Sequence, residues 1–306
     1  MDIMAILFGA LAAFGAGTLA ASIGAVNAFI MTGIMAIISG VATCLGADAG
    51  GITNVVTFGT IFGPHLSFAA GAAAAGYAKK IGKLENGCNL GQGLASLGEP
   101  KVLAVGGIFG IIGWAIGTFV VPFIFNGINA CGIETKGLIP LATDNPGMTV
   151  VISGVIARLA FGKRGLLSAK PSCLSKGKDL GGVITRGVAF SLMVAGTALA
   201  LNGNVKSMDG YNIIIFGFAA VTLIFPGMAS WHHIGIISAA AAVLAINNNL
   251  PDLAVLAMSV GCGLGAALLC NFENCLINTD VDSHIDGEGF SICLMTIVLS
   301  IIGLFL

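Results

Sequence analysis

The chain has 306 residues, of which 57% are hydrophobic and only 9% are charged, and its mean hydropathy is +1.00. Soluble domains carry roughly 25% charged residues, so this composition excludes a water-soluble fold. The formal net charge of -1 says little by itself, because in a membrane protein the distribution of charge between the loops carries the information. Nucleic acid is not expected as a partner.

Apolar runs of about 18 or more residues recur along the chain, and each can cross a hydrocarbon layer of roughly 30 Å at about 1.5 Å per residue. The first run has no basic region before it and no clear cleavage site after it, which indicates a span rather than a signal peptide. We predict an all-α polytopic integral membrane protein with about ten transmembrane helices. They lie near residues 3–23, 26–44, 52–78, 102–125, 146–162, 181–201, 211–225, 231–247, 252–271 and 289–306.

The third predicted span is interrupted by Gly63 and Pro64. A proline within a helix removes a backbone donor and favours a break at this point. Residues 45–62 lie just before the break and begin with a glycine-rich stretch. They form either part of a full span or a re-entrant segment.

Basic residues give the orientation, because Lys and Arg concentrate in loops that remain in the cytoplasm. Two basic loops follow the third and the fifth span, and both fall on one side if both termini lie outside. Their basic residues are Lys79, Lys80, Lys83, Lys101, Lys163, Arg164, Lys170, Lys176 and Lys178. We therefore predict a multi-pass protein of the cell membrane with both termini outside. Arg158 and Arg186, near the inner ends of their spans, are expected to extend to the membrane interface.

The two halves of the chain share four landmarks in the same order, which indicates an internal repeat. The pairs are Asn27–Gly33 with Asn212–Gly217, Pro64-His65 with Pro226, His232 and His233, Pro100 with Pro251, and Thr143-Asp144 with Thr279-Asp280. We predict two five-helix repeats, residues 1–165 and 181–306, joined by a basic cytoplasmic linker at residues 166–180. Because five is odd, the second repeat enters the membrane from the opposite side, so the repeats are inverted.

The break at Pro64 and His65 is the first candidate site. A broken helix leaves backbone groups without helical partners, and such segments bind ions or solutes in transporters. The alternative is a kink whose histidine bonds to a neighbouring helix. His232 and His233 take the corresponding place in the second half, where imidazoles can relay protons or bind a polar solute. Simple packing is the alternative for this pair as well.

Asp48 and Asn54 flank the glycine-rich stretch before the first break. Their oxygens can hold a cation, or they belong to a solvated loop. Asp144 and Asn145 either bind the solute or cap the helix that follows them.

Asp280 and Asp282 belong to an acidic segment that also contains His284 and Asp286. Oxygen ligands at this spacing can bind a hard cation, while a solvated cytoplasmic loop is the alternative. The sequence leaves open whether any metal binds. A membrane-embedded hydrolase built on this segment is disfavoured.

The sequence contains no Walker A motif, no HExxH, no nucleophile elbow and no dinucleotide fingerprint. We therefore expect no enzyme and no cofactor beyond a coupling ion.

The leading hypothesis is a permease, namely a secondary transporter of a small solute coupled to H⁺ or Na⁺, with its site between the repeats. A passive channel for a small polar solute and a non-transporting subunit of a larger membrane complex are the alternatives. The expected partners are membrane lipids and a small solute or ion. Helix surfaces rich in glycine and alanine also favour a homo-oligomer.

Overall fold

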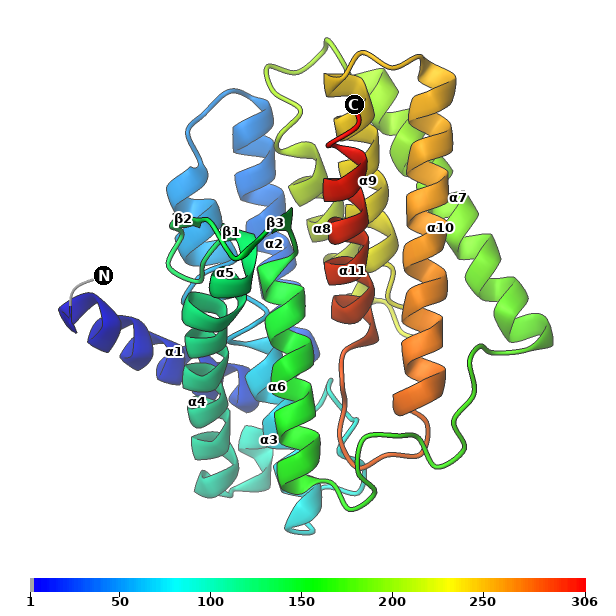
Figure 1. The fold of residues 1–306 in the computed structure, drawn as a ribbon. Coiled ribbons are helices and arrows are strands. Elements are labelled where there is room, and N and C mark those ends of the chain that lie inside the picture. Colours follow the sequence, from blue (N-terminus) through cyan, green and yellow to red (C-terminus); the bar gives the residue numbers. More distant parts are fainter. Residues whose placement is uncertain (1–2) are drawn as a thin grey trace.

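The structure is a computed structural model that describes residues 3–306, and it is mostly helical (Figure 1). Within these residues, five helices are long and apolar enough to cross a membrane. They are α1 (Ile3–Ile23), α2 (Ala25–Cys44), the continuous helix from α4 (Pro100–Ala115) through η3 (Ile116–Val120) to α5 (Val121–Ile124), α7 (Gly177–Leu201) and α10 (Asp252–Ile277). The chain is therefore a helical membrane protein, as the composition predicts.

Four shorter apolar helices also belong to the described bundle. They are α6 (Asn145–Phe161), α8 (Tyr211–Val221) with the turn η4 (Thr222–Ile224), α9 (His232–Asn247) and α11 (Gly287–Ile302). Each falls on a predicted apolar run. At about 1.5 Å per residue, helices of 16 or 17 residues such as α6, α9 and α11 are shorter than a hydrocarbon layer of roughly 30 Å.

The third predicted span is not one helix. It consists of the π-helical turn η1 (Ile52–Thr57), a run of turns, and the helix α3 (Phe68–Lys80). The predicted break at Gly63-Pro64 is confirmed. Side chains satisfy a carbonyl at the break: Thr32 Oγ1 donates to the carbonyl of Phe62 at 2.5 Å, and Ser67 Oγ donates to the same carbonyl at 3.2 Å. Such internal partners are required where no water is available.

A small sheet between α5 and α6 was not predicted. It contains β1 (Phe125–Ile128), β2 (Glu134–Thr135) and β3 (Ile139–Ala142), in the order β2-β1-β3. β1 pairs antiparallel with β2 and parallel with β3. The sheet returns the chain from the end of α5 to the start of α6.

The helices of the two halves pack in corresponding pairs. In the first half α1 contacts α4 and α3, and α3 contacts α6; in the second half α7 contacts α10 and α9, and α9 contacts α11. The halves meet chiefly through α2 against α8 and through α6 against α11. In Figure 1, α6 descends from the middle of the bundle while α11 rises from it.

Glycines bring the two halves into backbone contact. A Cβ placed on Gly33 of α2 would lie 2.9 Å from the carbonyl oxygen of Gly217, and one on Gly40 would lie 2.8 Å from that of Gly210. Because Gly33 faces Gly217 and Gly40 faces Gly210, α2 and α8 run antiparallel. Gly33 and Gly217, which end the first pair of sequence landmarks, therefore face each other.

The two basic loops lie at the same end of the molecule. Lys80 Nζ donates to the carbonyl of Ala160 at 2.8 Å, which joins the end of α3 to the end of α6. The backbone amide of Lys163 donates to Asp282 Oδ2 at 3.0 Å. Figure 1 shows these loops at the bottom of the bundle and the C-terminus at its top.

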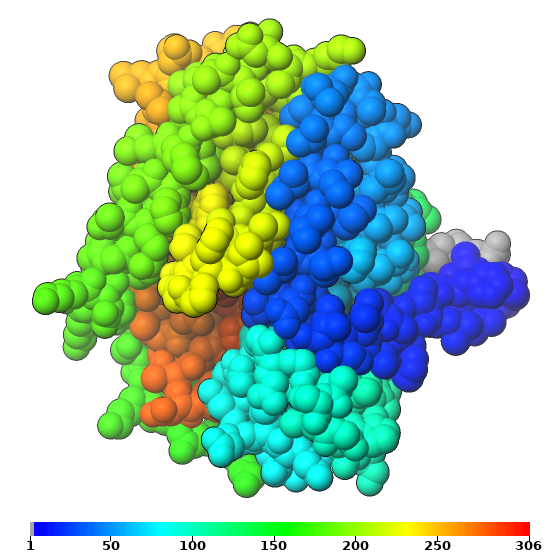
Figure 2. Space-filling view, turned by 180° about the vertical axis from the view of Figure 1, so that it is seen from behind, coloured from blue at the N-terminus to red at the C-terminus, as the bar shows by residue number. Residues whose placement is uncertain are grey.

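Apolar side chains cover much of the outer surface. α1 projects obliquely from the bundle, as Figure 2 shows, and exposes Phe8 and Leu11 among other large apolar residues. The break in the second half, residues 225–231, also reaches the surface and includes the exposed Phe225. Such surface is expected to face lipid or another protein.

Substitution of Gly33 by alanine tests the contact between the halves. The added Cβ would lie 2.7 Å from Ala220 Cβ as well as 2.9 Å from the Gly217 oxygen, so α2 and α8 must move apart. We expect Gly33→Ala to lower the free energy of unfolding by about 1–3 kcal/mol, measured as a lower thermal midpoint in detergent.

Gly196→Ala on the exposed face of α7 is the matched control, because its added Cβ meets no atom within 4 Å. Its midpoint should stay the same or rise slightly, since alanine is the better helix former. Equal midpoints for the two variants would contradict the close approach of α2 and α8.

Candidate binding cavity

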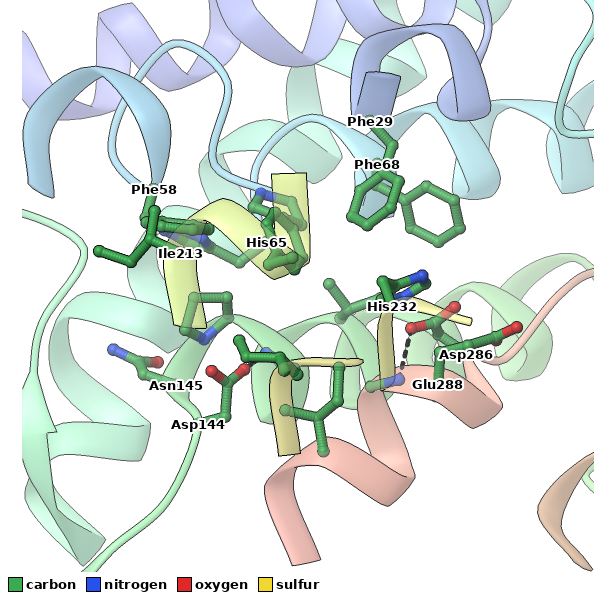
Figure 3. A pocket seen from close by; sticks show the side chains of 18 of the residues that line it. Phe29, Phe58, His65, Phe68, Asp144, Asn145, Ile213, His232, Asp286 and Glu288 are labelled. Carbon is green, nitrogen blue, oxygen red and sulfur yellow. Dashed lines mark hydrogen bonds between the residues drawn. The ribbon is translucent and has the colours of Figure 1, made fainter. Parts of the chain in front are cut away.

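A cavity of about 460 Å³ lies where the two halves meet. Side chains of α2, η1, the first break, α6, α8, α9 and the start of α11 form its walls (Figure 3). Aromatic rings supply much of the apolar wall: Phe29, Phe58, Phe68 and Phe216. The ionisable side chains that line it are His65, Asp144, His232, His284, Asp286 and Glu288. Among the described residues no lysine or arginine lines it.

Two helices begin at the cavity in the same way. Asp144 caps α6 by accepting a hydrogen bond from the amide of Gly147 at 2.6 Å, and Asp286 caps α11 by accepting one from the amide of Gly289 at 2.7 Å. Both sequences read Asp-x-x-Gly, with Pro146 in the first turn of α6. The interpretation of Asp144 as a helix cap is confirmed. Both carboxylates also line the cavity, and each helix start adds a partial positive charge there.

The two helix starts touch through their glycines. A Cβ on Gly147 would lie 2.9 Å from the oxygen of Gly289, and one on Gly289 would lie 3.0 Å from that of Gly147. Thr143 Oγ1 donates to the carbonyl of Cys293 in α11 at 3.0 Å. These contacts fix the distance between the two capping carboxylates.

His65 belongs to the break before α3 and is only 1% exposed. Its ring lies against η3, where a Cβ on Gly117 would be 3.1 Å from His65 Cδ2. Within the described part of the chain neither ring nitrogen has a hydrogen-bond partner. Buried polar groups are normally paired, so this imidazole is available to a ligand or to water.

The predicted pair of histidines in the second half is divided. His232 lines the cavity, where its Nδ1 lies 2.9 Å from Ser230 Oγ and its ring centroid lies 4.6 Å from that of Phe29. His233 does not line the cavity and lies beside Cys270 and Glu288. Successive residues at a helix start point in different directions, which explains the separation.

Asn54 lines the cavity from η1, and Asn145 lines it from the start of α6, which it also positions. Asn145 Nδ2 donates to the carbonyl of Gly117 at 2.7 Å and to that of Ile128 at 2.9 Å. Gly117 lies in the π-helical turn η3, and its carbonyl also accepts a hydrogen bond of 3.1 Å from the amide of Ala130. Asn145 therefore ties α6 to η3 and to β1.

Three predicted carboxylates lie outside the cavity, which corrects their assignment. Asp48 is exposed after α2, where its Oδ1 accepts a bond of 3.3 Å from the amide of Gly50. Asp280 is exposed, and its carbonyl accepts a hydrogen bond from Arg164. Asp282 accepts from the amide of Lys163 at the end of the bundle. The segment from α10 to α11 runs from this end to the centre, so only its last residues reach the cavity.

The structural counterpart of Asp144 is therefore Asp286 and not Asp280. Glu288 was not anticipated at all. The signal that could have found both is the sequence Asp286-Gly287-Glu288-Gly289, which repeats the Asp-x-x-Gly spacing of residues 144–147 immediately before an apolar run. The aromatic wall carries no sequence signal, because phenylalanine is common throughout the spans.

Arg158 holds the segment that leads to His284 and Asp286. It is 1% exposed, which contradicts the expected extension to the interface. Its guanidinium donates to Ser283 Oγ at 2.9 Å, to the carbonyl of Ile277 at 2.8 Å and to Asn278 Oδ1 at 3.1 Å. Asn278 in turn donates to the carbonyl of Ile285. A single cation at the end of α6 thus shapes the chain between α10 and α11.

Fold and site together define a polytopic helical membrane protein with a largely apolar cavity between its halves, which three carboxyl groups and three imidazoles also line. A family model described as a family of unknown function (DUF7973) matches residues 2–174, more than half of the chain, and the chain belongs to this family. No curated protein and no solved structure matches it.

Replacing Arg158 tests its structural role. Arg158→Lys keeps the charge but cannot form the planar array of donors, so several buried acceptors lose their partner. We expect the free energy of unfolding to fall by on the order of 3 kcal/mol, seen as a lower thermal midpoint in detergent.

Arg164→Lys is the control, because Arg164 lies in the exposed loop and bonds only to the carbonyl of Asp280 among the hydrogen bonds found here. Its midpoint should match the unsubstituted protein. An Arg158→Lys protein with an unchanged midpoint would show that the hydrogen bonds of the guanidinium contribute little.

Proposed function

We propose that the protein is a permease, and specifically a secondary transporter of a small solute coupled to a cation, H⁺ or Na⁺. One observation carries the proposal: three carboxylates and three imidazoles meet in a cavity between the two halves, and within the described residues no lysine or arginine lines that cavity. Ionisable groups at membrane depth are costly to keep and mark pathways for ions and solutes.

The charge balance favours a positively charged occupant. Asp144 and Asp286 each accept one hydrogen bond from a backbone amide, and the ring of His284 lies 3.2 Å from Asp286. Glu288 adds a third carboxyl group to the same wall. Protons or a cation can neutralise these groups, and a change in their charge changes what the cavity binds. That dependence is the physical basis of coupling.

The size and the lining of the cavity also limit which solutes can bind there. A volume of about 460 Å³ lies within the range of roughly 300–1,000 Å³ typical of small-molecule sites. Four phenylalanine rings provide apolar surface, while Asn54 and Asn212 add amide groups on opposite halves. The cavity thus suits a small solute with both an apolar face and a polar group.

The proposed architecture is two inverted five-helix repeats. The corresponding helix contacts, the antiparallel pair α2 and α8, and the two Asp-x-x-Gly starts all support it. The segment 166–180 would then link residues 1–165 to residues 181–306, and the family match ends within this segment. Inverted repeats place a site midway between them and allow it to open to either side in turn.

Transport itself is tested in proteoliposomes loaded with purified protein. A panel of radiolabelled amino acids, small carboxylates, nucleobases and sugars is offered with an inward H⁺ gradient, with an inward Na⁺ gradient, and without either. We expect at least one solute to accumulate only with a gradient, and an ionophore that collapses the gradient to abolish uptake. Glu288→Gln should reduce the accumulation at least about tenfold.

Asp280→Asn is the control for this assay, because Asp280 is an exposed carboxylate outside the cavity. Equal entry of a solute with and without a gradient would indicate a passive channel instead of a coupled transporter. No protein-dependent movement of any solute would favour a non-transporting subunit.

The orientation is proposed to place the basic loops in the cytoplasm and the termini outside. Cys173 is the one exposed cysteine of the described residues, and it lies in the basic loop between α6 and α7. A membrane-impermeant maleimide should therefore label it in inside-out vesicles and not in intact cells.

Asn202→Cys in a Cys173→Ser background places a thiol in the exposed loop between α7 and α8. It should show the opposite pattern of labelling. Labelling of both sites from the same side would contradict the proposed orientation.

A further inference from the structure

Glu288 belongs to two groups of potential metal ligands. In one group it lies with His284 and Asp286, and in the other with His233 and Cys270. Within each group the ligand atoms all lie within 4.8 Å of one another. The first group lines the cavity, and the second continues from Glu288 into the wall between α9, α10 and α11.

A second feature points independently to a ligand at this place. His233 is 5% exposed, and its Nδ1 has no hydrogen-bond partner within residues 3–306. A buried imidazole nitrogen without a partner costs free energy that a bound cation recovers. The ring is held at the start of α9, next to His232, so its position does not depend on a flexible loop.

The donor atoms select the class of cation. Imidazole nitrogen, thiolate sulfur and carboxylate oxygen together suit Zn²⁺ and similar divalent transition metals, whereas Mg²⁺ and Ca²⁺ prefer oxygen ligands alone. The sequence offers His284, Asp286 and Glu288 at alternate positions, so a short stretch supplies three donors to one region.

The site is confined to one half. The stretch that precedes and begins α6 has the same Asp-x-x-Gly cap, but Ala142 and Pro146 stand where α11 has His284 and Glu288. The cap therefore does not require those two ligands. Because His284 and Glu288 occur only beside α11, helix capping does not explain their presence there.

We propose that the protein binds a divalent transition-metal ion of the Zn²⁺ class on the α11 side of the cavity, with Glu288 as the common ligand. His284 and Asp286 coordinate the ion from the cavity, and His233 and Cys270 provide the adjacent buried donors. The assignment of this ion as cargo or as coupling ion rests on the proposed transport function. The binding site itself rests on the geometry alone.

The test is a titration of the purified, chelator-treated full-length protein in detergent with Zn²⁺, followed by calorimetry. We expect saturable binding that Glu288→Gln weakens at least about tenfold, because a direct ligand is lost. Asp280→Asn, an exposed carboxylate of the preceding segment, should bind Zn²⁺ with unchanged affinity.

Co²⁺ provides a second measurement that does not depend on whether Glu288→Gln folds. A thiolate bound to Co²⁺ gives an intense charge-transfer absorption, which Cys270→Ser should remove. The proposal is overturned if Zn²⁺ does not bind saturably, or if folded Glu288→Gln binds Zn²⁺ as tightly as the unsubstituted protein. It is also overturned if Mg²⁺ or Ca²⁺ competes with Zn²⁺ at equal concentration. Absence of the thiolate absorption from the Co²⁺ complex would overturn it as well.

The failure of this site and the failure of transport can be told apart. Saturable Zn²⁺ binding without gradient-dependent uptake of Zn²⁺ or of any panel solute would keep the site and reject the transporter. Gradient-dependent uptake of an organic solute in the presence of a chelator, without Zn²⁺ binding to the purified protein, would keep the transporter and reject the site.

Discussion

A helix that begins in the interior of a bundle exposes backbone amides that need hydrogen-bond acceptors there, and this constraint governs the centre of the protein. Both α6 and α11 begin at the cavity. Asp144 and Asp286 accept from the amides of Gly147 and Gly289, and the two glycines allow the helix starts to touch. Capping two helices at one place therefore also places two carboxylates on one cavity. Two of the three carboxyl groups on a largely apolar cavity thus follow from the satisfaction of the backbone.

The two halves contribute different kinds of side chain to the cavity. In the first half, η1 precedes the break and lies on the cavity wall, the break is largely buried, and His65 is enclosed beside η3. In the second half the break at residues 225–231 is largely exposed, and the ionisable ligands gather at the start of α11. The first half thus contributes an enclosed imidazole, amide groups and aromatic surface. The second contributes most of the groups that can hold a cation.

Buried charge serves two distinct purposes in this molecule. Within the described residues no carboxylate lies within salt-bridge distance of Arg158. Its hydrogen bonds are accepted by carbonyls, a serine and an asparagine at the end of the bundle. It shapes the chain that leads to His284 and Asp286. The carboxylates of the cavity instead lack a lysine or arginine partner among the lining residues, which leaves them available to a proton or a cation. The buried cation and the carboxylates of the cavity therefore lie at different heights of the bundle.

The sequence by itself determined the membrane class, the positions of the apolar helices, the break at Gly63-Pro64 and the cap at Asp144. These features depend on local composition, on proline chemistry and on side chains that bond within a few residues, all of which are readable along the chain. Tertiary structure alone decided which polar residues meet. Asp286 and Glu288 reach the cavity while Asp280 and Asp282 remain at the end of the bundle, because Arg158 and Asn278 fix how the intervening chain turns. His232 and His233 diverge because a helix start directs adjacent side chains apart. The first outcome is set by contacts between residues more than a hundred positions apart, which no local pattern encodes.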